Sequence, residues 1–169
     1  MLGVCLLAVA VFFAGCSAKV PRTQILPSDR SYSAELKGTL FAVSFAAQLD
    51  VEPEKGGVRA FSLRFLRSQS GIPEGLTLSG FCGAEGLSDQ SITARLGEVC
   101  VEVDPAVLQT LLLPVTVLVC RNDYTAIQKN ESGFLLRYPD GTTLTLSPDF
   151  LPLHYSSFAC DLDILSIPS

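Results

Sequence analysis

The sequence predicts a mainly β protein: a curved antiparallel sheet or incomplete barrel of about 8 to 10 strands with one short helix. Two observations carry this prediction. Beyond residue 34, apolar and polar residues alternate with a period of two over several short stretches, which is typical of strands with one buried face. Only the stretch from Asp104 to Pro114 has both the start and the stop signals of a helix.

Residues 1–15 are expected to form an export signal. Leu2 to Ala14 are an apolar run that suits a signal peptide and is too short to span a bilayer. The run ends in FAGC, which resembles the lipobox of bacterial lipoproteins. The resemblance implies that Cys16 carries acyl chains such as palmitate and anchors the mature protein to a membrane outside the cytoplasm. The alternatives are an uncleaved helical anchor and an ordinary signal peptide, and both export the domain.

The remaining chain is expected to be a tether over residues 16–33 followed by a single β-rich domain over residues 34–169. The tether is polar, contains Pro21 and Pro27, and shows no period, so it should behave as a flexible coil. From residue 31 onward nine basic residues face sixteen acidic ones, a net charge of −7. Such a domain should avoid nucleic acid and anionic lipid surfaces. We expect a monomer whose partners are the membrane and an apolar ligand.

The first part of the domain predicts a long strand and a hairpin. Alternation over Glu35 to Val51 indicates one strand, and turn residues at 52–57 separate it from a second alternating stretch. The apolar faces of these strands provide the candidate surface for an apolar ligand. That surface consists of Phe41, Val43, Phe45, Phe61, Leu63 and Phe65. The alternative is that these side chains fill a closed core.

Further along, strands are expected over residues 76–81, 91–96, 98–103, 115–121, 125–128, 134–138 and 158–164. Between them, Asp104 at the N-cap position and Pro105 at the first helical position predict a short helix that Pro114 ends. The clearest hairpin has its turn at Tyr138 to Thr142, where Pro, Asp and Gly occupy positions that suit a tight turn.

The order of these elements resembles the periplasmic lipoprotein-carrier family, the LolA/LolB-like proteins. The resemblance covers roughly residues 33 to 168 and is carried by the segments GIPEGLTLSGF, DPAVLQTLLLP and YPDGTTLTLSPDFLPL. It implies an incomplete barrel that wraps a helix and leaves an apolar cavity for acyl chains. The expected function is therefore a lipid-anchored, non-enzymatic domain of the bacterial cell envelope that binds an apolar ligand or a lipoprotein acyl chain. The alternative is a structural or protein-interaction module at the envelope.

Catalytic and metal-binding motifs are not found. The only histidine is His154, which leaves little for a Ser-His-Asp mechanism, and there is no G-x-S-x-G, C-x-x-C, H-E-x-x-H or EF-hand pattern. Asp161 and Asp163 share one face of the last strand, where acidic residues usually serve solubility. We therefore expect no enzyme activity, no catalytic residues, no metal and no cofactor.

The expected mature chain contains four cysteines besides Cys16. Export permits disulfides, and four cysteines allow three pairings. If one bridge forms, we expect it between Cys100 and Cys120, because these residues lie on predicted strands that flank the helix. Cys160 lies on an apolar face and should be either a buried thiol or bridged.

Overall fold

The computed structural model describes residues 26, 28–69, 71–83, 86–87, 91–121 and 123–167, apart from the side chain of Cys120. The described residues form twelve strands, an α-helix and one π-helical segment. In chain order these are β1 (Tyr32–Leu40), β2 (Val43–Val51), β3 (Val58–Ser68), β4 (Thr77–Gly83), β5 (Gly86–Leu87), β6 (Ile92–Leu96), β7 (Val99–Val103), α1 (Pro105–Val115), η1 (Thr116–Cys120), β8 (Ala126–Asn130), β9 (Gly133–Arg137), β10 (Thr143–Leu146), β11 (Pro152–Ser156) and β12 (Cys160–Ile167).

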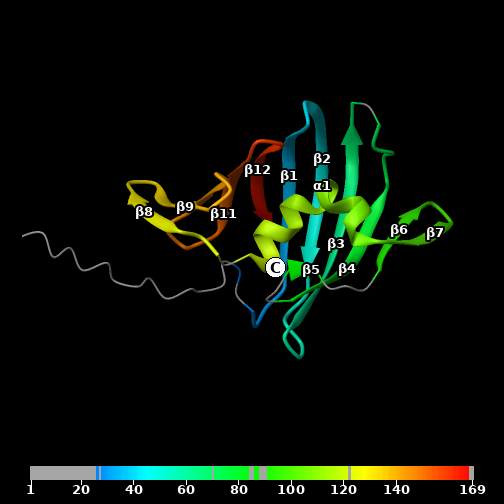
Figure 1. Ribbon diagram of the computed structural model, residues 1–169, viewed down its shortest axis with the longest axis horizontal. Helices are drawn as coiled ribbons and strands as arrows, with labels where there is room; N and C mark the ends of the chain where they lie inside the picture. The colour runs from blue at the N-terminus through cyan, green and yellow to red at the C-terminus, as the bar shows by residue number, and fades with distance from the viewer. Residues whose placement is uncertain are drawn as a thin grey trace, which may run out of the picture.

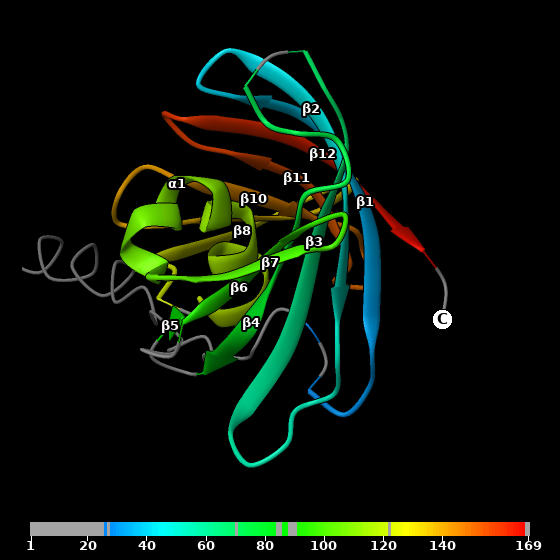
Figure 2. The ribbon, with the colours of Figure 1, turned by 90° about the vertical axis from the view of Figure 1, so that its right-hand side faces the viewer.

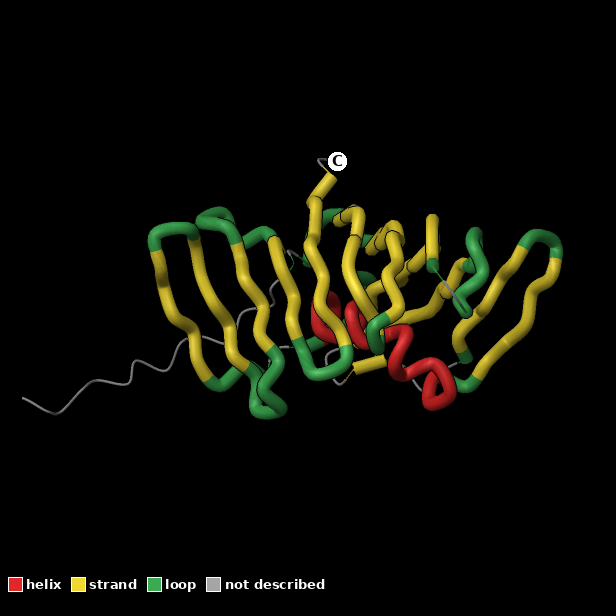
Figure 3. Tube along the Cα trace, turned by 90° about the horizontal axis from the view of Figure 1, so that it is seen from above, coloured by secondary structure: helices red, strands yellow, loops and turns green. Residues whose placement is uncertain are grey.

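The strands make one antiparallel sheet in the order β7-β6-β4-β3-β2-β1-β12-β11-β10-β9-β8, and β5 pairs with β4 at the side of this path. The sheet curls around α1 and η1, which lie in its concave face (Figures 1 and 2). Seen from above, the row of strands stays open, with β7 and β8 at its two ends (Figure 3). The predicted incomplete barrel with one short helix is confirmed.

The predicted long strand from Glu35 to Val51 is wrong, because the chain reverses at Phe41 and Ala42. These two residues connect β1 to β2, and both have positive φ, 46° and 63°. A two-residue turn reverses the parity of the alternation: even-numbered positions such as Leu36 are buried in β1, whereas odd-numbered positions such as Leu49 are buried in β2. The change of parity between Leu40 and Val43 is the trace that this turn leaves in the sequence, and the prediction of one long strand overlooked it.

Three further boundaries differ from the predictions. Residues 116–120 form η1 rather than a strand, because they fill the concave face instead of joining the sheet. β11 was not predicted, and Phe158, assigned to the last strand, is a fully exposed turn residue. Before residue 34, Tyr32 starts β1 and Leu26 is buried in the core.

The close pairing of β1 and β12 depends on one glycine. A Cβ atom at Gly38 would clash with the backbone carbonyl oxygen of Asp161 on β12. Because β1 and β12 join the two halves of the sheet, this close pairing keeps the concave face continuous.

Candidate functional site

The concave face of the sheet is an apolar wall. Most of the predicted ligand-facing residues lie on it: Phe45, Phe61, Leu63 and Phe65 are all buried. The rings of Phe45 and Phe65 pack with their centroids 5.7 Å apart. Val43 is only partly buried, and Phe41 lies outside the wall because it occupies the exposed β1–β2 turn. Four of the six residues therefore lie on the inner face and Phe41 lies outside it, whereas their binding of an apolar ligand stays a prediction.

The wall is covered by a single segment, α1 followed by η1, which we call the plug segment (residues 105–120). The side chain of Asp104 caps α1 by accepting a hydrogen bond from the backbone N–H of Ala106 at 2.8 Å, as the sequence predicts. Pro114 does not end the helix but lies inside it. Beyond it the wider π-helical turn continues to Cys120, and Arg121 N–H donates to the carbonyl oxygen of Thr116.

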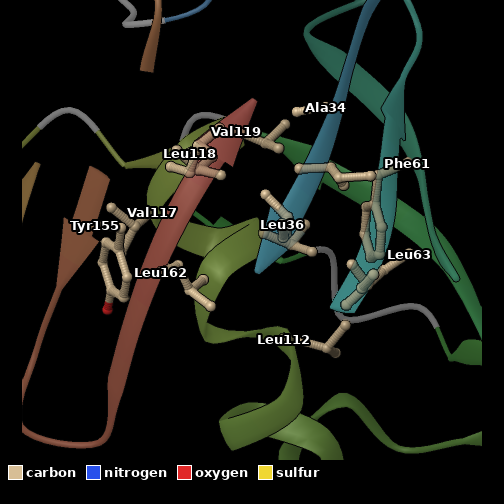
Figure 4. Packing of buried hydrophobic residues seen from close by; sticks show 14 of the residues in the cluster. Ala34, Leu36, Phe61, Leu63, Leu112, Val117, Leu118, Val119, Tyr155 and Leu162 are labelled. Atoms are coloured by element: carbon tan, nitrogen blue, oxygen red, sulfur yellow. The ribbon is translucent and has the colours of Figure 1, made fainter. Parts of the chain in front are cut away.

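Side chains of the plug segment fill the concavity. Leu112, Val115, Val117 and Leu118 are almost completely buried. Figure 4 shows Leu112, Val117 and Leu118 directed toward residues of the sheet such as Leu36 and Leu162. The predicted wall is thus part of a filled core in this structure, and a ligand can reach it only when the plug segment moves.

The opposite side of the plug segment is uncharged, and it exposes Val107 together with the polar side chains of Gln109 and Thr110. No residue from Pro105 to Cys120 carries a charge, and the side chain of Val107 is 75% exposed. A cavity of about 620 Å³ runs along the helix, with Leu113 of α1 and Leu87 of β5 in its lining. Leu96, Val99 and Val101 of the β6–β7 hairpin are exposed as well. The plug segment therefore lacks the charged outer face of an ordinary surface helix.

An ion-pair cluster fastens the C-terminal end of the plug segment. Arg121 donates hydrogen bonds to Asp123 at 2.7 Å and to Asp140 at 2.6 Å, and its guanidinium lies 4.6 Å from the ring centroid of Tyr138. Burial alone would lower the pKa of Arg121, but the two carboxylates raise it further above its usual value. For the acid Asp140 the directions are reversed. Burial alone would raise its pKa, but hydrogen bonds from Arg121 and Thr142 lower the pKa overall. We call Arg121 and Asp140 the clamp.

The cysteines differ from the predicted pairing. Cys82 on β4 is disulfide-bonded, whereas Cys100 and Cys160 are free. The predicted bridge between Cys100 and Cys120 is therefore wrong, because Cys100 lies exposed on the edge strand β7. Cys160 is a buried thiol, one of its two expected states, and burial together with the nearby Asp161 raises its pKa to about 12. The side chain of Cys120 lies outside the described residues.

Polar side chains of β11 and β12 pair with each other on the convex face. His154 on β11 pairs with Asp163, Nδ1 to Oδ1 at 3.0 Å, and Ser156 donates to Asp161 rather than to the histidine. Both aspartates are exposed, as predicted. Within the described ranges, no group of three or more His, Cys, Asp or Glu side chains is placed to hold a metal ion. The predicted lipid acceptor Cys16 lies outside the described residues.

Two functionally placed residues were missed in the sequence. Arg59 is buried on the inner face, where it donates to the backbone carbonyl oxygens of Glu52 at 3.0 Å and Arg30 at 3.2 Å. Its alternation with Phe61 and Leu63 was the signal that could have revealed it. Arg121 carried no such signal, because its partner Asp140 belongs to a turn 19 residues away.

Comparisons with known proteins give two similar solved structures. No family profile and no curated protein match the chain. The crystal structure of LprF from Mycobacterium bovis is 11% identical over 82% of this chain and 84% of that chain, with a TM-score of 0.35. A LolA superfamily protein from Nitrosomonas europaea is also 11% identical, over 79% of this chain and 66% of that chain, with a TM-score of 0.35. In the part of the chain that the structure describes, no helix is long and apolar enough to cross a membrane.

Proposed function

We propose that this protein is a lipid-anchored, non-enzymatic domain of the bacterial cell envelope that binds an apolar ligand, such as an acyl chain, against the concave face of its sheet. The observation that supports this proposal is the character of the plug segment. It is uncharged over its whole length, fills an apolar wall on one side and exposes Val107 beside uncharged polar side chains on the other. An ordinary amphipathic helix would carry charged residues on its outer side.

Exchange of the plug segment for a ligand is energetically feasible. Its four fully buried side chains contribute roughly 1.5–3 kcal/mol each, or about 6–12 kcal/mol together. An acyl chain of about sixteen carbons gains about 0.8 kcal/mol per buried CH₂, or about 12 kcal/mol. The two quantities are similar, so a long acyl chain could replace the contacts of the plug segment, whereas a short one could not.

The anchor is the second part of the proposal. The FAGC motif at Cys16 supports lipidation, and ten residues separate Cys16 from the buried Leu26, enough to span at most about 35 Å. Changing Cys16 to Ser should move the exported protein from the membrane fraction to the soluble fraction. If the variant stays in the membrane fraction, the N-terminal run is an uncleaved helical anchor.

Ligand binding is tested with the purified Cys16→Ser protein, which lacks the lipid. It should bind a long-chain fatty-acid methyl ester saturably in native mass spectrometry and release an apolar fluorescent dye when the ester is added. Loosening the clamp with Arg121→Ala should speed dye entry. The matched control is Lys37→Ala, which removes an exposed ion pair with Glu35 (3.0 Å) on the outer face.

A second candidate is favoured by the filled core. If neither the parent protein nor the Arg121→Ala variant binds dye or ester, the concave face is only a core. The protein is then better described as a structural or protein-interaction module of the envelope.

A further inference from the structure

Two tyrosine hydroxyl groups are buried in the apolar interior without a hydrogen-bond partner. Tyr155 on β11 is 0% exposed and Tyr138, which follows β9, is 3% exposed, and neither hydroxyl is bonded. Buried hydroxyl groups are nearly always paired, because burial removes them from water without compensation. Tyr32, a third buried tyrosine, follows the rule, since its hydroxyl lies 3.2 Å from Ser166 Oγ. The two unpaired hydroxyls are therefore candidates for contact with a ligand.

The two tyrosines lie on the same wall, under the end of the plug segment. Leu144 on β10 is in register with Tyr155, and the next inward position, Thr142, accepts a backbone hydrogen bond from Tyr138 at 2.9 Å. In Figure 4 Tyr155 lies beside Val117 of η1. The ring of Tyr138 is covered by Arg121, the residue that follows η1. Movement of the plug segment would therefore uncover both tyrosines.

Both phenols are hydrogen-bond donors at neutral pH. Burial raises the pKa of Tyr138 and that of Tyr155, so both phenols keep their protons. The side chains of Ser157 and Thr142 act in the opposite direction on the pKa of Tyr155. Among the described residues, no side chain meets hydrogen-bonding geometry with its hydroxyl group. Two O–H groups are thus available to an acceptor that enters the interior.

The surrounding charges select the kind of acceptor. The guanidinium of Arg121 is already paired with the carboxylates of Asp123 and Asp140, so one cation faces two anions near Tyr138. A free fatty-acid carboxylate would meet repulsion from these two aspartates. A neutral carbonyl oxygen, as in an ester or an amide, accepts hydrogen bonds from phenols and adds no charge.

We propose that the hydroxyl groups of Tyr138 and Tyr155 form a carbonyl-binding subsite that selects an ester- or amide-linked acyl chain over a free fatty acid. The subsite rests on the proposed function, because an acyl chain must first enter against the concave face. The subsite would recognise the polar group at the head of the acyl chain, which the apolar wall cannot bind by a hydrogen bond.

The test compares three probes on the purified Cys16→Ser protein: methyl palmitate, palmitate and hexadecane. The ester should bind more tightly than the free acid. Tyr138→Phe and Tyr155→Phe should each weaken ester binding roughly five- to tenfold, the effect of one hydrogen bond, and leave hexadecane binding unchanged. The matched control Tyr32→Phe removes a hydroxyl that is already paired and should not change ester binding.

Stability of the ligand-free protein provides a second readout. Tyr155→Phe removes an unpaired hydroxyl and should leave the melting temperature unchanged or raise it, whereas Tyr32→Phe should lower it. If Tyr155→Phe lowers it as much as Tyr32→Phe does, a buried water already satisfies the hydroxyl and the subsite does not exist. Equal loss of ester and hexadecane binding would show a packing role and also overturn the subsite.

Failure of the two proposals can be distinguished. If the protein binds ester and hexadecane but both Phe variants bind the ester normally, only the carbonyl subsite is wrong. If the parent protein binds none of the three probes, the proposed function is wrong and the subsite with it.

Discussion

Replacing Phe41-Ala42 by Asn-Gly should stabilise the domain. Both residues have positive φ in the two-residue turn between β1 and β2, a conformation that costs a residue with a side chain roughly 1–2 kcal/mol. Turns of this type strongly prefer Asn-Gly. Another tight β-turn, between β2 and β3, already has glycine at both positive-φ positions, Gly56 and Gly57.

The magnitude follows from two opposing terms. Removing the cost of positive φ at the two positions stabilises the folded state by about 2–4 kcal/mol. The added flexibility of glycine in the unfolded chain offsets roughly 0.5–1 kcal/mol of this gain. Phe41 is 58% exposed, so removing its ring loses only a part of the stabilisation that a fully buried phenylalanine would give. The net expectation is about 1–3 kcal/mol, or a rise of roughly 3–10 °C in melting temperature for a domain of this size.

Thermal and urea unfolding of the Cys16→Ser protein, with and without the double substitution, measure this effect. The control is Phe158→Asn, which removes an exposed ring at the neighbouring hairpin tip, where Phe41 N–H donates to Ala159 O at 2.8 Å. That control should change stability by less than about 0.5 kcal/mol. A double variant that unfolds at or below the melting temperature of its parent would refute the reasoning, because the turn would then carry no conformational cost.

Three further predictions concern the core, the thiols and the clamp. Leu112→Ala should destabilise the domain by about 2–5 kcal/mol in urea unfolding, whereas Val107→Ala, on the exposed side of the same helix, should cost less than about 0.5 kcal/mol; similar values would mean that the plug segment is not packed on the sheet. Native alkylation followed by peptide mapping should label Cys100 rapidly and leave Cys160 unmodified, because the pKa of Cys160 is raised to about 12 and its thiol is buried; fast labelling of Cys160 would contradict its burial. The pKa of Asp140 is lowered in the folded state, since its hydrogen bonds outweigh burial, so its contribution to stability is present above the unfolded pKa of about 4 and is lost as the pH falls through the folded value. The stability difference between wild type and Asp140→Asn should therefore shrink from pH 7 to pH 3 in urea titrations, and a constant difference would refute the assignment.

Local patterns in the sequence were sufficient for the class of fold and for several elements. Alternation with a period of two identifies strands because one face of each is buried. The N-cap at Asp104 and the turn from Tyr138 to Thr142 depend only on residues within a few positions, and both are observed. The apolar wall follows from the same alternation, which placed Phe61, Leu63 and Phe65 correctly.

Other features were decided by contacts between segments far apart in the chain. The turn at Phe41-Ala42 has no turn-forming residue, and the pairing of the flanking strands forces it. Residues 116–120 are rich in β-branched residues and favour a strand by propensity, but η1 fills the concave face that the other strands create. In both places the energy of tertiary packing exceeds the local preference.

The candidate site shows the same division. Its apolar character could be predicted, because burial leaves a periodic pattern in the sequence. Its polar groups could not: the clamp joins residues 19 positions apart, and nothing in the sequence distinguishes the unpaired Tyr155 from the paired Tyr32. Whether a buried hydroxyl finds a partner depends on which side chains the folded sheet brings within hydrogen-bonding distance, and no local pattern encodes that distance.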